Sequence, residues 1–154
     1  MKPLTAMLWF DGRAEEATNF YVSLFPDSKV LGVMRAPKGT PGTKEGQALT
    51  TSFRINGTEF TALNGGPQFK FNESVSFLVF CKNQKELDAY WEKLTAGGGK
   101  GVACGWLKDK YGLSWQVTPD RLLELMRGPK MPKVMEAFMK MRKFDIATLE
   151  RAAK

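Results

Sequence analysis

The sequence contains no histidine among its 154 residues. Histidine is the side chain most used for acid–base chemistry near neutral pH and a common transition-metal ligand, so histidine-based triads and histidine metal sites are excluded. Cysteine is scarce as well, since Cys81 and Cys104 form at most one disulfide and have no zinc-type spacing. We interpret both as buried, ordinary thiols in a reducing compartment.

Long hydrophobic runs are also missing. No apolar stretch approaches the ~20 residues that a membrane-spanning helix needs. The first residues run into a strand-like segment rather than a signal peptide. The composition, 43% apolar and 25% charged, is typical of one compact domain with a buried core. We expect a cytoplasmic protein that does not bind membranes.

Positive charge is concentrated near the C-terminus. The net charge is +7, and residues 127–154 carry eight Lys or Arg against three Asp or Glu, so +5 of the +7 lies there. Such an asymmetry marks some surfaces that bind nucleic acid. A lysine-rich helix face in solvent explains it more simply, because aromatic residues there are few. We favour the solvated face and expect no nucleic-acid partner, keeping nucleic-acid binding as a third hypothesis.

Hydrophobic patterns predict an element order that occurs twice. The first half predicts a strand, a helix and three more strands, at residues 4–10, 14–24, 29–35, 49–55 and 59–64. Asn56-Gly57 is a strong hairpin signal between the last two strands. The second half predicts a strand at 75–81, a helix capped by Asn83 and Glu86, and strands at 101–108 and 113–118. Two β-α-β-β-β units of similar length imply pseudo-twofold symmetry.

After Pro119 the pattern changes to helices. Residues 120–126 predict one helix, and apolar stripes through Val134 and Ile146 predict two more. Methionines in such a stripe are typical of core or interface packing, either on the sheets or on a partner subunit. We therefore divide the chain into a domain over 1–118, made of modules 1–67 and 68–118, and a C-terminal helical extension over 119–154.

Motifs for nucleotide binding are absent. Residues 97–101 (GGGKG) lack the Lys-Ser/Thr ending of a phosphate loop and precede a strand, which favours a flexible connector. No G-x-G-x-x-G follows a strand, and the element order leaves no parallel doubly wound sheet for a dinucleotide or an adenosyl donor. We expect no nucleotide cofactor.

Three tracts resemble one family: MLWFDGRAEEATNFYVSLFPDS, ALNGGPQFKFNESVSFLV and CGWLKDKYGLSWQVTP. They are similar to the PhnB-like branch of the vicinal oxygen chelate superfamily, which includes glyoxalase, bleomycin-resistance and dioxygenase proteins. Members of this branch are often named after 3-demethylubiquinone-9 3-methyltransferase. The resemblance implies an α+β fold in which two βαβββ modules form a U-shaped mixed sheet around a pocket, usually in a homodimer.

Enzymes of that superfamily place histidine and glutamate metal ligands at inward strand positions. By pattern, the resemblance puts Thr5, Thr61 or a near neighbour, Ser74 and Gln116 at those positions in this chain. Hydroxyl and amide groups supply no charge to offset the dehydration of a divalent ion. We therefore expect no bound metal and no cofactor. The methyltransferase name has no support in the residues, because no donor-binding fold is visible.

Strand alternation extends these inward positions into a pocket lining. The set combines aromatic, apolar, hydroxyl and amide side chains, with Trp106 and Asn64 expected at the mouth of the pocket: Thr5, Met7, Trp9, Thr61, Asn64, Ser74, Ser76, Trp106, Ser114 and Gln116. Leu78 and Phe80 continue the row of Ser74 and Ser76. Such a lining suits a neutral or weakly polar small molecule held by hydrogen bonds. The alternative is that the tryptophans fill the core and the hydroxyls bond to backbone or water.

Charged residues near strand ends are candidates for acid–base chemistry: Glu59, Glu73, Lys108 and Asp109. No spacing pairs them, and solvated charges are the simpler explanation; Cys104 becomes reactive only beside Lys108. We favour a metal-free small-molecule-binding protein whose ligand the sequence does not name. The alternative is a superfamily enzyme, a lyase, dioxygenase, transferase or 3-demethylubiquinone-9 3-methyltransferase, acting on a small organic substrate.

Overall fold

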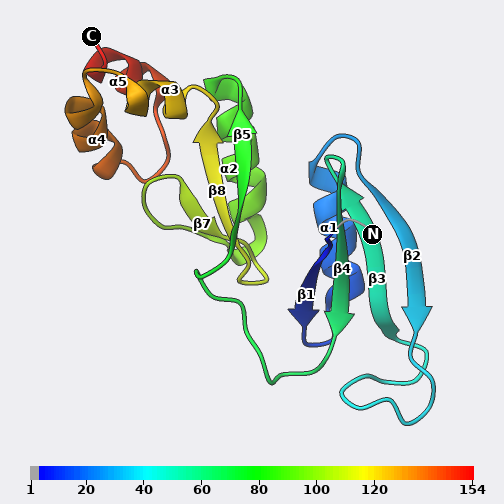
Figure 1. Cartoon of the computed structure of the whole chain (residues 1–154). Coiled ribbons are helices and arrows are strands. Elements are labelled where there is room, and N and C mark those ends of the chain that lie inside the picture. The colour runs from blue at the N-terminus through cyan, green and yellow to red at the C-terminus, as the bar shows by residue number, and fades with distance from the viewer. Residues whose placement is uncertain (1–3) are drawn as a thin grey trace. The chain divides into compact units, whose positions relative to one another are not determined.

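The computed structural model describes residues 4–154, which divide into two compact units (Figure 1). The first unit ends at Phe71 and the second spans Asn72–Lys154. Each unit contains one four-stranded mixed sheet with a helix on one face. The α+β fold class and the repeated element order are thereby confirmed.

The sheet of the first unit has the strand order β1-β4-β3-β2. Its strands are β1 (Ala6–Phe10), β2 (Lys29–Arg35), β3 (Ala48–Ile55) and β4 (Thr58–Asn64), and its helix is α1 (Ala14–Leu24). The β1–β4 pair is parallel and the other pairs are antiparallel. Asn56 and Gly57 both have positive φ angles, 45° and 81°, which confirms the predicted tight hairpin between β3 and β4.

Alternation along these strands separates a buried face from an open face. Phe53 and Phe60 point toward α1, where their rings stack with centroids 5.5 Å apart and Phe53 also contacts Tyr21 of the helix. The intervening residues, such as Ser52 and Thr61, lie on the other side of the sheet. We call the side turned away from a unit's helix its open face.

The sheet of the second unit repeats the arrangement, with the order β5-β8-β7-β6 and a parallel β5–β8 pair. Its elements are β5 (Ser76–Cys81), α2 (Gln84–Thr95), a short helix η1 (Ala96–Gly98), β6 (Lys100–Gly101), β7 (Trp106–Lys108) and β8 (Ser114–Pro119). The predicted cap of α2 is confirmed, because Glu86 N donates to Asn83 Oδ1 over 2.9 Å. The carboxylate of Glu86 reaches back to Lys82 N at 2.7 Å.

The single strand predicted over 101–108 is wrong, because the chain turns between β6 and β7. Cys104 and Gly105 adopt positive φ angles of 53° and 78° in this turn. Their amides donate to the carbonyls of Met141 and Arg142, at 2.8 and 2.9 Å. The turn is therefore stabilised by a segment almost forty residues away, which a local apolar pattern does not reveal.

The predicted C-terminal helices are confirmed as α3 (Leu122–Arg127), α4 (Met131–Met139) and α5 (Ile146–Ala152). They pack together around Val134, Phe144 and Leu149, which are all buried. The side-chain amide of Gln84 connects them to the start of α2, because it donates to Phe144 O at 3.0 Å and accepts from Ile146 N at 2.9 Å. The extension is thus part of the second unit.

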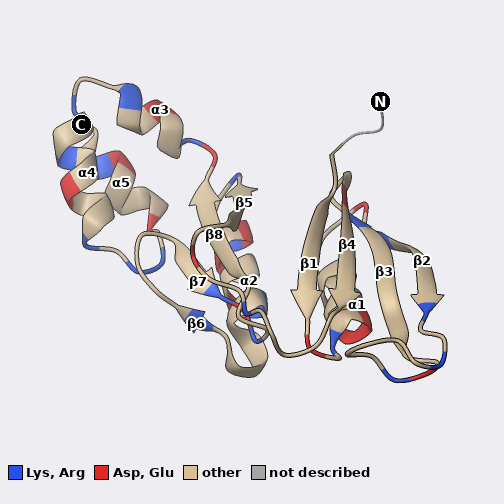
Figure 2. Cartoon of the chain, turned by 60° about the horizontal axis from the view of Figure 1, so that its bottom comes forward, with Lys and Arg blue, Asp and Glu red and all other residues tan. Residues whose placement is uncertain are grey.

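The basic residues of this extension are interspersed with acidic ones (Figure 2). Lys140 pairs with Glu136 and Lys143 pairs with Asp88, both at 2.6 Å. Part of the predicted positive surface is therefore neutralised locally. Within residues 4–154, every helix is too short or too polar to cross a lipid bilayer.

Candidate functional site

The open face of the second sheet carries two neighbouring rows of side chains. Leu107 and Val117 are fully buried toward α2, so the residues that alternate with them lie on the open face. The strand register defines the first row, here called the Lys108 row, as Lys100, Lys108, Ser114 and Ser76. The second row, here called the Trp106 row, consists of Trp106, Gln116 and Leu78.

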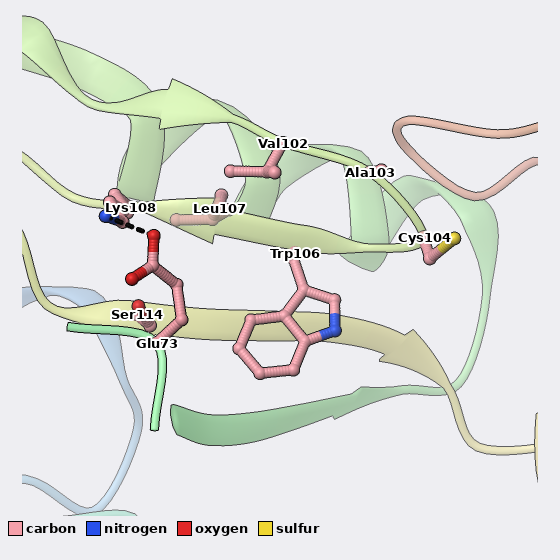
Figure 3. Close-up of a pocket in the computed structure, with 8 residues that line it drawn as sticks. All are labelled: Glu73, Val102, Ala103, Cys104, Trp106, Leu107, Lys108 and Ser114. Atoms are coloured by element: carbon pink, nitrogen blue, oxygen red, sulfur yellow. Dashed lines mark ion pairs between the residues drawn. The ribbon is translucent and has the colours of Figure 1, made fainter. Parts of the chain in front are cut away.

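A pocket of about 320 Å³ lies at one end of these rows (Figure 3). Its lining comes from the segment before β5, the turn between β6 and β7, and strands β7 and β8: Glu73, Val102, Ala103, Cys104, Trp106, Leu107, Lys108 and Ser114. This volume is at the low end of the range for small-molecule sites, roughly 300–1,000 Å³. A mostly apolar wall with a few polar groups is typical of such sites.

An ion pair marks the polar end of the pocket. Glu73 Oε1 lies 2.5 Å from Lys108 Nζ, although the two residues are far apart in the sequence. The hydrogen bond from Lys108, together with a backbone hydrogen bond and the positive charge of Lys108, lowers the pKa of Glu73 below its usual 4.5. A carboxylate with a lowered pKa stays ionised at neutral pH and is a weak general base.

Ser114 contributes a buried hydroxyl to the same lining. Its side chain is fully buried, and its Oγ has no hydrogen-bond partner. Ser114 is the ladder neighbour of Lys108, so the hydroxyl and the ammonium group lie on the same side of the sheet. Since nearly all buried polar groups in proteins are hydrogen-bonded, this hydroxyl is the group in the pocket most in need of a ligand.

The two other polar side chains predicted on this face bond to each other. Gln116 Nε2 donates to Ser76 Oγ over 2.9 Å. This hydrogen bond fixes the Gln116 side chain between the Trp106 row and the Lys108 row. Four of the predicted site residues, Ser76, Trp106, Ser114 and Gln116, are thus brought together by the second sheet.

The two cysteines differ in their surroundings. Cys81 is fully buried as predicted, and burial is the main cause that raises the pKa of its thiol to about 12. Cys104 is half-buried, lines the pocket, and its Sγ lies 3.7 Å from Phe138 O. Cys104 was expected to be reactive only if it lay beside Lys108. Figure 3 shows the two residues at opposite ends of the pocket, so this requirement is not met.

The predicted site residues of the first unit lie on its own sheet. Met7, Trp9 and Thr61 share the open face, and Thr5 precedes β1 and is exposed. Trp9 is held in place by its surroundings, because its Nε1 donates to Gly66 O at 2.8 Å and Phe69 meets its ring edge-on at 4.9 Å. Their role in ligand binding stays a prediction.

Asn64 lies on the opposite side of that sheet. It is buried, accepts from Ala14 N at 2.9 Å and donates to Ala48 O at 2.8 Å. Its amide thus connects the start of α1 to β3, and Asn64 has a structural role on the side away from the open face. Ser74 precedes β5 instead of lying in it, and both its amide and its hydroxyl contact Asn72 Oδ1.

Two acid–base candidates have structural contacts instead. Asp109 is buried and accepts hydrogen bonds from Tyr111 N, Leu113 N and Trp115 Nε1, at 2.8, 3.1 and 2.9 Å. It therefore stabilises the turn before β8. Glu59 forms an ion pair with Arg54 at 2.9 Å on the open face of the first sheet.

The side chains that the resemblance puts at metal-ligand positions do not fit a resident divalent metal. Thr5, Thr61 and Gln116 offer neutral oxygens, and the Gln116 amide is bonded to Ser76. Across residues 4–154, no three His, Cys, Asp or Glu side chains come close enough together to hold a metal ion. Neutral donors alone offset the dehydration of such an ion poorly.

Comparison with known proteins gives one family match and several structural matches. The model of a family described as 3-demethylubiquinone-9 3-methyltransferase matches residues 2–118. A PhnB protein from Bacillus cereus, named after the same methyltransferase, is 34% identical, with a TM-score of 0.63 over 75% of this chain and 97% of that protein. A search of curated proteins finds no match.

Two more distant structures share the fold. A protein from Pseudomonas aeruginosa is 14% identical, with a TM-score of 0.58 over 75% of this chain and 95% of its own. The fosfomycin resistance protein FosX from Mesorhizobium loti is 12% identical, with a TM-score of 0.52 over 74% of this chain and 87% of its own. The helices α3 to α5 lie beyond the residues that the family model matches.

Proposed function

This chain belongs to the family described as 3-demethylubiquinone-9 3-methyltransferase, within the glyoxalase and bleomycin-resistance superfamily, and we propose that it binds a small organic molecule. The ligand occupies the pocket on the open face of the second sheet and binds without a resident metal. Its flat apolar part rests against Trp106, and one polar atom of the ligand bonds to Ser114 Oγ.

The observation that carries this proposal is the buried Ser114 hydroxyl in an apolar pocket. The hydroxyl has no protein partner, and Val102, Ala103 and Trp106 are apolar residues that line the same pocket. A ligand that stacks on an indole and satisfies a buried hydroxyl gains both apolar burial and a hydrogen bond made away from water. An exposed charged residue offers a ligand neither an apolar surface nor a hydrogen bond made away from water.

Methyl transfer, the activity in the family's description, finds less support in this chain. Each sheet has a single parallel pair, β1–β4 or β5–β8, beside two antiparallel pairs. Adenosyl and dinucleotide donors typically bind at the switch point of a doubly wound parallel sheet, so the described residues do not fit such a donor. Calorimetry with S-adenosylmethionine tests this, and saturable binding would revive the enzymatic alternative.

Isothermal titration calorimetry with indole and phenylacetamide, two neutral flat probes, tests the binding site. We expect both probes to bind, and Trp106→Ala to lower their affinity by roughly tenfold, about 1.4 kcal/mol. The control is Met7→Ala, which removes an exposed apolar side chain from the open face of the first sheet and leaves affinity unchanged. Absence of binding by both probes, or a loss caused by Met7→Ala alone, would contradict the proposed site.

Elemental analysis of protein purified without chelator or affinity-tag metal tests the metal-free part of the proposal. We expect no stoichiometric metal, and no stabilisation by added divalent ions in thermal unfolding. Stoichiometric metal, or a rise of several degrees in Tm with one ion, would overturn it.

We further propose that the chain forms a homodimer, as is usual in the superfamily. The exposed apolar side chains of β2, among them Val33 and Met34, supply surface for such a contact. Light scattering coupled to size-exclusion chromatography gives the mass in solution, and a monomer at high concentration would contradict the proposal.

A further inference from the structure

The polar end of the pocket holds more positive than negative charge. Lys100 lies directly opposite Lys108 in the β6–β7 ladder. Gly101 follows Lys100 in β6, and a Cβ added to it would overlap the Trp91 ring of α2. Position 101 is therefore on the helix side of the sheet, and the side chain of Lys100 lies on the open face. Side chains opposite each other in an antiparallel pair have Cβ atoms about 4.5–5.5 Å apart, so the side chains of Lys100 and Lys108 begin side by side at one corner of the open face.

One carboxylate lies at this corner, because Glu73 pairs with Lys108. Like charges directly opposite in a ladder repel each other. A second anion at this corner would therefore be attracted more strongly than a neutral group.

The buried hydroxyl and the indole complete a two-part site. Ser114 Oγ lies beside Lys108 in the Lys108 row, and the Trp106 row lies two residues farther along the strands, about 7 Å away. The first row offers a cation and an unpartnered hydroxyl. The second offers a flat apolar surface. A small molecule with an anionic group close to a planar ring reaches both rows.

We infer that the ligand of this pocket is a small aromatic carboxylate or a similarly built anion, whose charged group takes the place of the Glu73 carboxylate on Lys108. This inference rests on the proposed function and names its ligand class. Glu73 is suited to being displaced, because it belongs to the turn before β5 and its side chain is 61% exposed. Exposed ion pairs are weak, so a ligand that also buries its ring against Trp106 displaces the carboxylate.

Calorimetry with phenylacetate and its neutral analogue phenylacetamide tests the inference. We expect the wild-type protein to bind phenylacetate roughly tenfold more tightly than phenylacetamide. Lys108→Gln removes this preference, because the cation that attracts the carboxylate is gone. Glu73→Gln strengthens phenylacetate binding several-fold, because the competing carboxylate is gone.

Lys93→Gln is the matched control for the loss of one positive charge, because Lys93 is exposed on α2 on the other side of the sheet. It leaves both affinities unchanged, and thermal unfolding of each variant verifies that it is folded. Equal affinities for the two probes, or weaker phenylacetate binding by Glu73→Gln, would overturn the inference while the proposed function stands. If neither phenylacetate nor phenylacetamide binds, the inference is overturned, and if indole does not bind either, the proposed function is overturned with it.

Discussion

Trp9 and Trp106 lie on the open faces of two sheets with the same strand order, but their surroundings differ. The residues just after β4 cover Trp9, since Gly66 accepts its indole N–H and Phe69 packs against its ring. Trp106 instead forms the wall of a pocket. Each sheet therefore carries an indole on its open face, although β1 and β7 are not equivalent strands of the repeat, and the local contacts decide whether the indole is packed or available.

The second difference is the C-terminal extension. Gly105 has no room for a side chain, because a Cβ there would overlap the Phe144 ring. The carbonyls of Met141 and Arg142 accept from the turn that separates β6 from β7. The extension thus shapes one wall of the pocket, whereas the first unit ends at Phe71 without such a support.

Phe144→Ala tests this support and has the largest expected effect. Phe144 is 1% exposed, so its truncation lowers the free energy of unfolding by about 3–5 kcal/mol, as expected for a buried aromatic residue. Denaturant unfolding measures the loss. Hydrogen exchange is expected to show faster exchange at the amides of Cys104 and Gly105, with Gly65 in the first unit unchanged. Equal loss of protection in both units would contradict a specific support of the β6–β7 turn by the C-terminal extension.

Asn64→Ala and Gln116→Ala compare two amides that the sequence pattern did not distinguish. Removal of the Asn64 amide leaves Ala14 N and Ala48 O unpaired in the core, at a cost of about 2–4 kcal/mol. Gln116→Ala breaks one partly buried bond to Ser76 and costs about 1 kcal/mol or less. Urea unfolding measures both, and the reverse order would show that their structural roles are misassigned.

Trp9→Ala and Trp106→Ala separate a packed indole from an available one. Trp9 is half-buried, so we expect a loss of roughly 2 kcal/mol, below the ~3–5 kcal/mol of a fully buried aromatic residue. Trp106→Ala is expected to cost less in stability and to reduce indole binding. Thermal unfolding and calorimetry on the same samples give both quantities. A larger stability loss for Trp106→Ala would remove the distinction.

The pH dependence of two exposed ion pairs gives the smallest effect. Hydrogen bonds from Lys108 and Arg35 lower the pKa of Glu73 and Glu15, respectively, from their usual 4.5. A lowered folded-state pKa stabilises the protein above pH 4.5, and this contribution is lost as the pH falls through the folded value. Glu73→Gln and Glu15→Gln are therefore slightly destabilising at neutral pH and neutral in acid, which urea unfolding across pH measures.

Phenylacetate binding is expected to distinguish the Glu73 ion pair from the Glu15 ion pair. At neutral pH, where Glu73 is charged, saturating phenylacetate is expected to stabilise Glu73→Gln more than the wild type and to affect Glu15→Gln as it affects the wild type. An equal shift for both variants would contradict a special role for Glu73.

Local signals in the sequence were sufficient to predict most of the fold. The hairpin at Asn56-Gly57, the cap at Asn83 and the alternation in β3 each depend on residues close in the chain. The turn at Cys104 was missed because its hydrogen-bond acceptors come from the distant extension. A run of apolar residues with no proline or asparagine resembles a continuous strand.

The site was predictable only in part. Strand alternation identified Ser114 and Gln116 as residues of one face, and the register adds Trp106, which the sequence pattern had placed only at the mouth of the pocket. The pairing of Glu73 with Lys108 depends on how the segment before β5 lies beside β7, and no spacing encodes that contact. A polar residue at a strand end can face either side, so the orientation of Asn64 needed the register of β4.

The most direct test follows the indole N–H signals in a ¹H–¹⁵N spectrum during titration with phenylacetate. The chain has four tryptophans, so each signal is assignable by single substitution. We expect the Trp106 signal to shift in a saturable manner and the Trp9 signal to stay in place. A saturable shift of Trp9 with Trp106 unchanged would contradict the claim that the second sheet carries the binding site.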